Sequence, residues 1–227
     1  MKKTVQRVIV ATSISLLSLI AVALSVLHFF PPPLEVAIAN NFGPSPAWFP
    51  EQMPRYNEHW FASVLHIIPG ALLVILAPIQ LSARIRNTKP GLHRFTGRVF
   101  ILIAIPMTLS AMYLAWTIPF GGDLEKYSFP LMAVGFLFAL GCGIYQIRQG
   151  NRAAHRLWMS RMLAIAYAPI TMRLILLIIT SFGVDGQKIF AEAMWLGLGI
   201  NWVLVHLWIR RNNTAHAPLN EDATGRA

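Results

Sequence analysis

Six apolar runs of about twenty residues each dominate this sequence. They cover residues 8–30, 59–83, 97–118, 128–147, 158–181 and 189–209. A helix needs roughly 20 apolar residues to cross the hydrocarbon core of a bilayer. Because only helices and closed barrels satisfy every backbone hydrogen bond inside that core, the pattern predicts an all-α fold, a polytopic transmembrane bundle of six helices.

The composition agrees with a membrane protein and excludes several soluble classes. Of the 227 residues, 56% are hydrophobic and 12% are charged, whereas soluble domains carry about 25% charged residues. A net charge of +10 would suit nucleic acid, but the basic residues cluster at alternate ends of the apolar runs. We therefore predict a lipid bilayer and no nucleic acid as partner. The single cysteine, Cys142, excludes an internal disulfide and a cysteine-rich metal site.

The basic residues also predict an orientation. Fifteen of the 19 lysines and arginines fall on one side of the predicted membrane, three fall on the other, and Arg173 lies within a run. Cytoplasmic loops are enriched in Lys and Arg. We therefore expect both termini in the cytoplasm and three hairpins outside, in a multi-pass protein of the cytoplasmic (inner) membrane.

The chain divides into four predicted segments. Residues 1–30 form a cytoplasmic N-terminus and a first helix, for which a cleaved signal peptide is the alternative. Residues 31–58 form an outer loop with seven of the 15 prolines, which should prevent regular structure; this loop is a linker or a lid. Residues 59–210 form a five-helix transmembrane core, and residues 211–227 a disordered cytoplasmic tail.

Small residues at four-residue spacing predict close helix contacts. Gly135, Ala139 and Gly143 share one helix face, and Ala193 and Gly197 share another. Membrane helices approach each other through such faces. The faces serve packing within the bundle or assembly into a homo- or hetero-oligomer.

Two basic loops resemble each other. In each, a His-Arg pair is followed by a further arginine, and a proline comes eight residues after that arginine. The loops read Gln80, Arg84, His93-Arg94, Arg98, Pro106 and Gln146, Arg148, His155-Arg156, Arg161, Pro169. This pattern favours a parallel duplication of two helix hairpins about an axis along the membrane normal.

Together with His66, Gly70, Ser110 and Arg173, these loops resemble the pattern of a bacterial membrane family. It is the family catalogued as domain of unknown function 2306, and the resemblance covers about residues 60–180. It implies the fold and the topology. It implies no activity and assigns no catalytic residues.

The His-Arg loops predict an anion site on the cytoplasmic side. His93 and His155 lie near the starts of their helices, where free backbone N–H groups favour negative charge. Arginine forms bidentate hydrogen bonds with anions. The candidate residues are His93, Arg94, Arg98, His155, Arg156, Arg161 and, near the inner end of the last helix, His206. The alternative is that these residues only set the topology.

His66 and Arg173 predict a second site, in the outer half of the bundle. Ionisable groups inside membrane helices are costly and mark functional sites. The structural alternative pairs Arg173 with Glu192 or lets it extend outward, and has His66 bond a carbonyl freed by a proline. The functional alternative is a site for a small anionic or lipidic ligand.

Three functions fit these residues. No metalloprotease, hydrolase or phosphate-loop motif occurs, so we predict no catalytic residues and no metal and leave enzyme activity open. The protein is a non-catalytic scaffold or accessory subunit, or a binder or transporter of a small anionic or lipidic molecule. The alternative is a redox protein with haem b held by histidines chosen from His66, His93, His155 and His206.

Overall fold

Helices make up almost all of the described chain. The computed structural model describes residues 49–213, in which no strand occurs. In chain order, the helices are α3 (Phe49–Glu58), α4 (Trp60–Leu81), α5 (Ala83–Thr88), α6 (Pro90–Thr117), α7 (Asp123–Arg148), α8 (Arg152–Ala166), α9 (Ala168–Thr180) and α10 (Phe190–Asn213).

Five helical segments are long and apolar enough to cross a membrane. They are α4, α6, α7, the pair α8–α9, and α10. The predicted all-α fold and five of its six spans are therefore confirmed. The sixth predicted span, residues 8–30, lies outside the described residues, as do residues 31–48 of the predicted loop and residues 214–227 of the predicted tail.

The helices extend beyond several of the predicted spans, and one predicted span is broken. The helix expected from residue 97 begins at Pro90, because proline is well tolerated at the first helical position and a helix can continue beyond the apolar core. The single helix expected over residues 158–181 divides at Tyr167 into α8 and α9. Pro169 follows this break and has no N–H to continue the helical hydrogen bonds.

The expectation that prolines prevent regular structure in residues 31–58 is wrong for α3. Pro50 is the second residue of α3, where its missing N–H leaves nothing unsatisfied, and Pro54 removes only one helical hydrogen bond. The end of α3 is tied to the next helix, because the Ser63 hydroxyl donates to the Tyr56 carbonyl over 3.0 Å.

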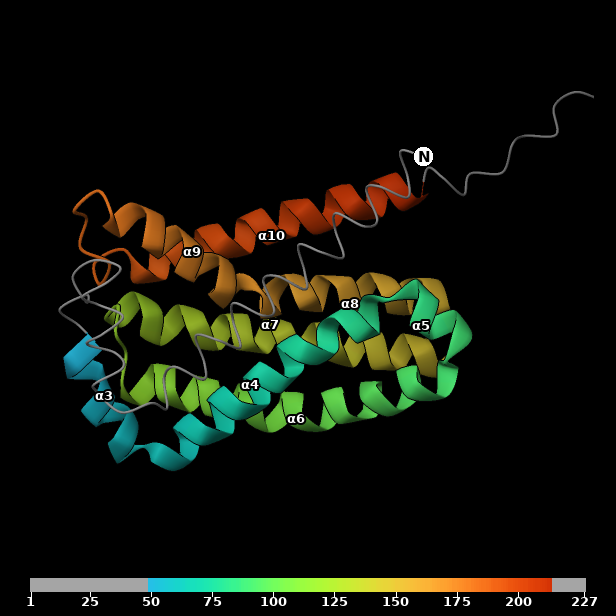
Figure 1. Ribbon diagram of the computed structural model, residues 1–227, viewed down its shortest axis with the longest axis horizontal. Coiled ribbons are helices and arrows are strands. Elements are labelled where there is room, and N and C mark those ends of the chain that lie inside the picture. Colours follow the sequence, from blue (N-terminus) through green and yellow to red (C-terminus); the bar gives the residue numbers. More distant parts are fainter. Residues whose placement is uncertain (1–48, 214–227) are drawn as a thin grey trace, which may run out of the picture.

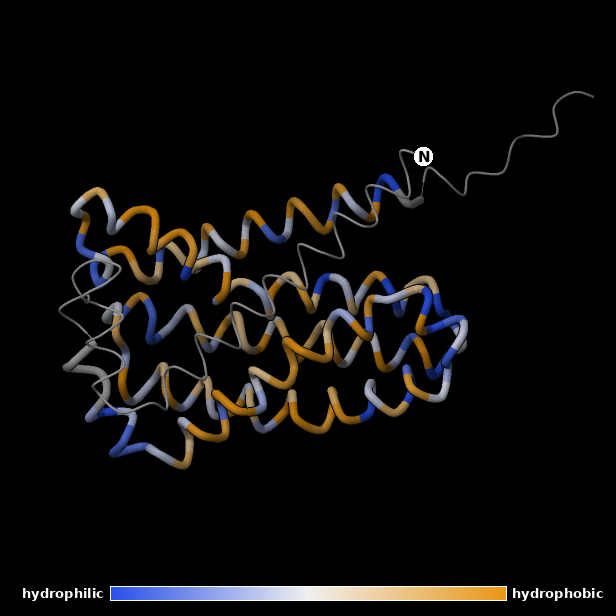
Figure 2. Tube along the Cα trace, viewed as in Figure 1, coloured by the Kyte–Doolittle hydropathy of each residue, from blue (hydrophilic) through white to orange (hydrophobic). Residues whose placement is uncertain are grey.

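The helices form antiparallel neighbours with turns at two ends (Figure 1). Helix α4 packs on α6, α6 on α7, α7 on α8, and α9 on α10. We call the end with α5 and the α7–α8 turn the α5 end, and the opposite end, with α3 and the α6–α7 turn, the α3 end. Figure 2 shows hydrophobic residues along the helices and hydrophilic residues gathered at these ends, as expected for a bundle that spans a bilayer.

A packed core joins the first four long helices. Leu73 and Ala77 of α4, Phe100 of α6, Leu140 of α7 and Met162 of α8 are all buried in one cluster. A smaller cluster joins α9 to α10 through Ala168, Met172, Ala193 and Met194. Large apolar side chains also cover the outside, where a soluble protein would be polar.

The predicted small-residue contacts are confirmed. A Cβ atom added at Gly143 would lie 2.8 Å from the Met159 sulfur, and one added at Gly197 would lie 3.0 Å from the Ala168 carbonyl oxygen. Ala139 and Ala193 are both buried. These residues therefore let α7 approach α8 and let α10 approach α9.

Candidate functional site

Arg173 is tied to the backbone of its own helix. Its Nη1 donates to the Pro169 carbonyl over 3.0 Å, and both residues belong to the span Arg152–Thr180. The guanidinium is therefore held against the preceding turn of α9. The alternative in which Arg173 extends outward to the interface stays a prediction.

No carboxylate of the described segment pairs with Arg173. Lys188 pairs with Asp185 over 3.9 Å, on the surface, and no ion pair between described residues includes Arg173. Glu192 is exposed in the first turn of α10, at the α3 end. The proposed Arg173–Glu192 pair is therefore wrong, since the guanidinium bonds the Pro169 carbonyl instead.

His66 and Tyr56 lie within electrostatic range of Arg173. The Tyr56 side chain comes from α3, and burial raises the pKa of its hydroxyl while the neighbouring Arg173 lowers it. We call Tyr56, His66 and Arg173 the Arg173 site. The two predicted residues thus lie within electrostatic range of each other, and Tyr56 joins them. Sequence reasoning missed Tyr56 because it lies in the proline-rich segment.

The His66 ring is oriented by the backbone of α6. Its Nδ1 donates to the Met107 carbonyl over 3.2 Å, and the Ser110 hydroxyl donates to the same oxygen over 3.0 Å. The carbonyl left without a donor by Pro106 is that of Leu102, four residues earlier, so the expected bond to a freed carbonyl is wrong. Because Nδ1 is occupied, Nε2 is the nitrogen that remains for a ligand.

Glu125 is a buried carboxylate at the α3 end that sequence reasoning did not single out. Its Oε2 accepts from the backbone N–H of Phe120 over 2.6 Å and of Gly121 over 2.5 Å. An acid in the first turn of a helix, directly after a Gly-Gly turn, is the signal that could have identified this role. Glu125 fixes the α6–α7 turn.

At the α5 end, the structure brings cations from both hairpins together. His93 lies within electrostatic range of His155, Arg94 and Arg86. Arg86, on α5, lies within range of Arg156 on α8, and its pKa is lowered by partial burial and then by Arg156. Arg86 was not among the predicted residues, although its place in the same basic loop was a visible signal.

Three predicted residues stand apart from this cluster. Arg161 lies two turns deeper in α8 than the residues of its first turn, and its guanidinium lies over the Trp158 ring at 4.9 Å. Arg98 is exposed on α6. His206 bonds the Trp202 carbonyl of its own helix over 2.9 Å. No described contact joins these three side chains to the cluster.

The described residues do not provide a bis-histidine haem site around His66. His59, the other histidine in the half of the bundle toward the α3 end, precedes the same helix, whereas the two ligands must come from facing positions. His93, His155 and His206 lie in the opposite half, and His28 is outside the described residues. Across residues 49–213, no group of three His, Cys, Asp or Glu side chains is arranged to hold a metal ion.

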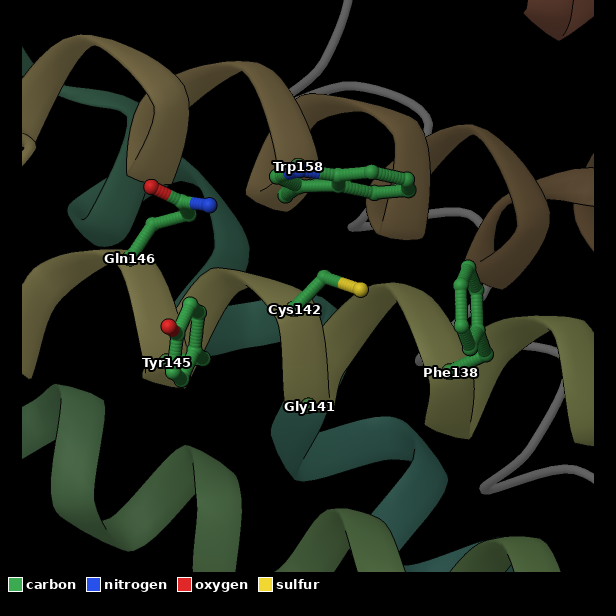
Figure 3. A pocket seen from close by; sticks show the side chains of 6 residues that line it. All are labelled: Phe138, Gly141, Cys142, Tyr145, Gln146 and Trp158. Carbon is green, nitrogen blue, oxygen red and sulfur yellow. The ribbon is translucent and has the colours of Figure 1, made fainter.

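An apolar groove runs between α7 and α8 (Figure 3). It has a volume of about 510 Å³ and is lined by Phe138, Gly141, Cys142, Tyr145, Gln146 and Trp158. The rings of Phe138 and Trp158 meet edge to face at 5.7 Å. Because no charged side chain lines this groove and Phe138 and Tyr145 are exposed, the groove suits lipid tails better than a charged ligand.

Comparison with known proteins identifies a family. Residues 63–209 match the family model described as Predicted membrane protein (DUF2306), which confirms the predicted resemblance. No curated protein and no solved structure matches the chain.

Proposed function

Since the chain belongs to the DUF2306 family of predicted membrane proteins, whose description names no activity, we propose a function from its own residues: it binds or transports a small anionic ligand at the Arg173 site. The observation that carries this proposal is the charge of Arg173 inside a membrane span. Its guanidinium bonds only a backbone carbonyl, that of Pro169, and no described carboxylate pairs with it.

The energy of a charged arginine supports an anionic ligand. An arginine inside a membrane helix is costly, up to about 2.5–3.5 kcal/mol at the helix centre on insertion scales, so Arg173 calls for a compensating partner. The Arg173 side chain is exposed, so the described helices do not cover its charge. A carboxylate fits the guanidinium bidentately, and the free Nε2 of His66 offers a second polar contact.

Benzoate and its uncharged analogue benzamide test this proposal. We expect benzoate to raise the melting temperature of the purified full-length protein in a neutral detergent, and benzamide to have no effect, because only the carboxylate neutralises Arg173. Arg173→Gln should weaken benzoate binding about tenfold or more, the loss expected for one charge-assisted bidentate contact.

The matched control is Arg98→Gln, which removes an exposed arginine from α6 and should leave benzoate binding unchanged. Equal stabilisation of wild type and Arg173→Gln by benzoate would contradict the proposal, and so would the absence of any stabilisation of the wild type. Either result would favour the scaffold role.

The orientation of the bundle is a separate part of this proposal. We place the α5 end and both termini in the cytoplasm, because 15 basic residues lie on that side against three on the other. Reporters fused to either terminus or inserted at Gly150, in the α7–α8 turn, should report the cytoplasm. A reporter within residues 40–55 should report the outside, and an external C-terminus would contradict the six-span topology.

A further inference from the structure

Cations from the two hairpins meet at the α5 end. The α4–α6 hairpin contributes Arg86 and His93, and the α7–α8 hairpin contributes His155 and Arg156. Arg86 lies within electrostatic range of Arg156, and His93 within range of His155. Figure 1 shows α5 at the same end of the bundle as the α7–α8 turn. We call these four residues the α5-end cluster.

No described carboxylate neutralises the α5-end cluster. The acidic residues of the described segment all lie at the α3 end, in or beside α3, the α6–α7 turn and the start of α10: Glu51, Glu58, Asp123, Glu125, Asp185 and Glu192. Like charges that face one another without a counterion repel. The enrichment of cytoplasmic loops in Lys and Arg requires only that these residues lie on the cytoplasmic side. It does not explain why the four residues of the α5-end cluster come together from separate hairpins.

Neighbouring groups hold the cluster in place. The His155 Nδ1 donates to the Gly143 carbonyl over 2.8 Å, which leaves Nε2 as its free nitrogen. On the other hairpin, the Gln80 amide donates to the His93 carbonyl over 3.1 Å and to the Thr96 hydroxyl over 2.5 Å. The His93 Nδ1 is buried and has no partner among the described residues. A buried polar nitrogen without a partner is rare and leaves a hydrogen-bonding position that a ligand, an ion or a water can fill.

We propose that Arg86, His93, His155 and Arg156 bind a phosphate group that bridges the two hairpins. A phosphate carries up to two negative charges and several acceptor oxygens, which matches two guanidinium forks and two imidazoles. The phosphate belongs to a lipid headgroup or to a soluble phosphorylated compound. This site lies in the half of the bundle opposite the Arg173 site. Each of the two proposals can therefore be tested, and contradicted, independently of the other.

Two probes distinguish the sources of the phosphate. Inorganic phosphate is added to the purified full-length protein in a neutral detergent, with sodium chloride at equal ionic strength as reference. Short-chain phosphatidic acid is added in a second series, with short-chain phosphatidylcholine as reference. We expect at least one phosphate probe to raise the melting temperature above its reference. Stabilisation by inorganic phosphate indicates a soluble compound, and stabilisation by phosphatidic acid alone indicates a lipid headgroup.

Two matched double variants test the residues. Arg86→Gln/Arg156→Gln should weaken binding of the phosphate probe that stabilises the wild type about tenfold or more, since it removes both bidentate donors. Arg84→Gln/Arg148→Gln removes the same charge from the same end, at exposed positions, and should bind as wild type. If the first double variant does not fold, Arg86→Lys/Arg156→Lys keeps the charge but loses the fork geometry, and should also bind more weakly.

The proposal is overturned if neither phosphate probe raises the melting temperature above that of its reference. It is also overturned if the two Gln double variants lose binding equally. In the second case, only the net positive charge of this end matters. Benzoate binding at the Arg173 site should be unchanged in Arg86→Gln/Arg156→Gln, and a loss there would show a general folding defect instead of a lost phosphate site.

Discussion

Replacing Glu125 by alanine is expected to lower the free energy of unfolding by about 3 kcal/mol, because it removes two charge-assisted hydrogen bonds from backbone N–H groups, one of them buried. Those N–H groups belong to Phe120 and Gly121. The turn they form also holds α10, since the Gln187 amide donates to the Phe120 carbonyl over 3.1 Å and the Phe120 and Phe190 rings meet at 4.9 Å.

Unfolding of the purified protein by sodium dodecyl sulfate in mixed micelles measures this loss. Asp123→Ala is the matched control, because Asp123 is an exposed acid in the same first turn of α7 and contributes only through the helix dipole, about 0.3–1 kcal/mol. Glu125→Gln keeps an acceptor oxygen, so its loss in the free energy of unfolding should lie between those of Glu125→Ala and Asp123→Ala. A loss no larger for Glu125→Ala than for Asp123→Ala would mean that the carboxylate does not hold this turn.

Gly197→Ala is expected to destabilise the protein by about 2 kcal/mol, as overpacking of a close helix contact does. The added Cβ would lie 3.0 Å from both the Ala168 carbonyl oxygen and the Met172 backbone nitrogen. Backbone atoms of α9 cannot rotate away as a side chain can, so α10 must separate from α9.

Two other glycines provide a graded comparison for Gly197→Ala. At Gly143, the nearest atom to an added Cβ is the Met159 sulfur at 2.8 Å, near the end of a flexible side chain; at Gly199 nothing lies within 4 Å. The expected order of destabilisation is Gly197→Ala, then Gly143→Ala, then Gly199→Ala, which should be neutral. Equal melting temperatures for Gly197→Ala and Gly199→Ala would show that α9 and α10 are not in this close contact.

The sequence by itself determined the helical spans and the small-residue contacts. Hydropathy is a sum over about twenty consecutive residues, and crossing a bilayer depends on that sum and on the internal hydrogen bonds of a helix. The five described spans therefore follow from local sequence alone. The same holds for the Gly143 and Gly197 contacts, because four-residue spacing places small residues on one helix face wherever that helix packs.

Only the tertiary structure decided the partners of the polar side chains. A sequence gives the depth of Arg173 and His66 in their helices, but a hydrogen bond depends on rotamer and on which neighbour lies opposite. The structure thus turns Arg173 to Pro169 instead of Glu192, and His66 to Met107. It also joins Arg86 to the His-Arg loops and gives Glu125 two backbone donors, because these contacts depend on how separate elements pack in three dimensions.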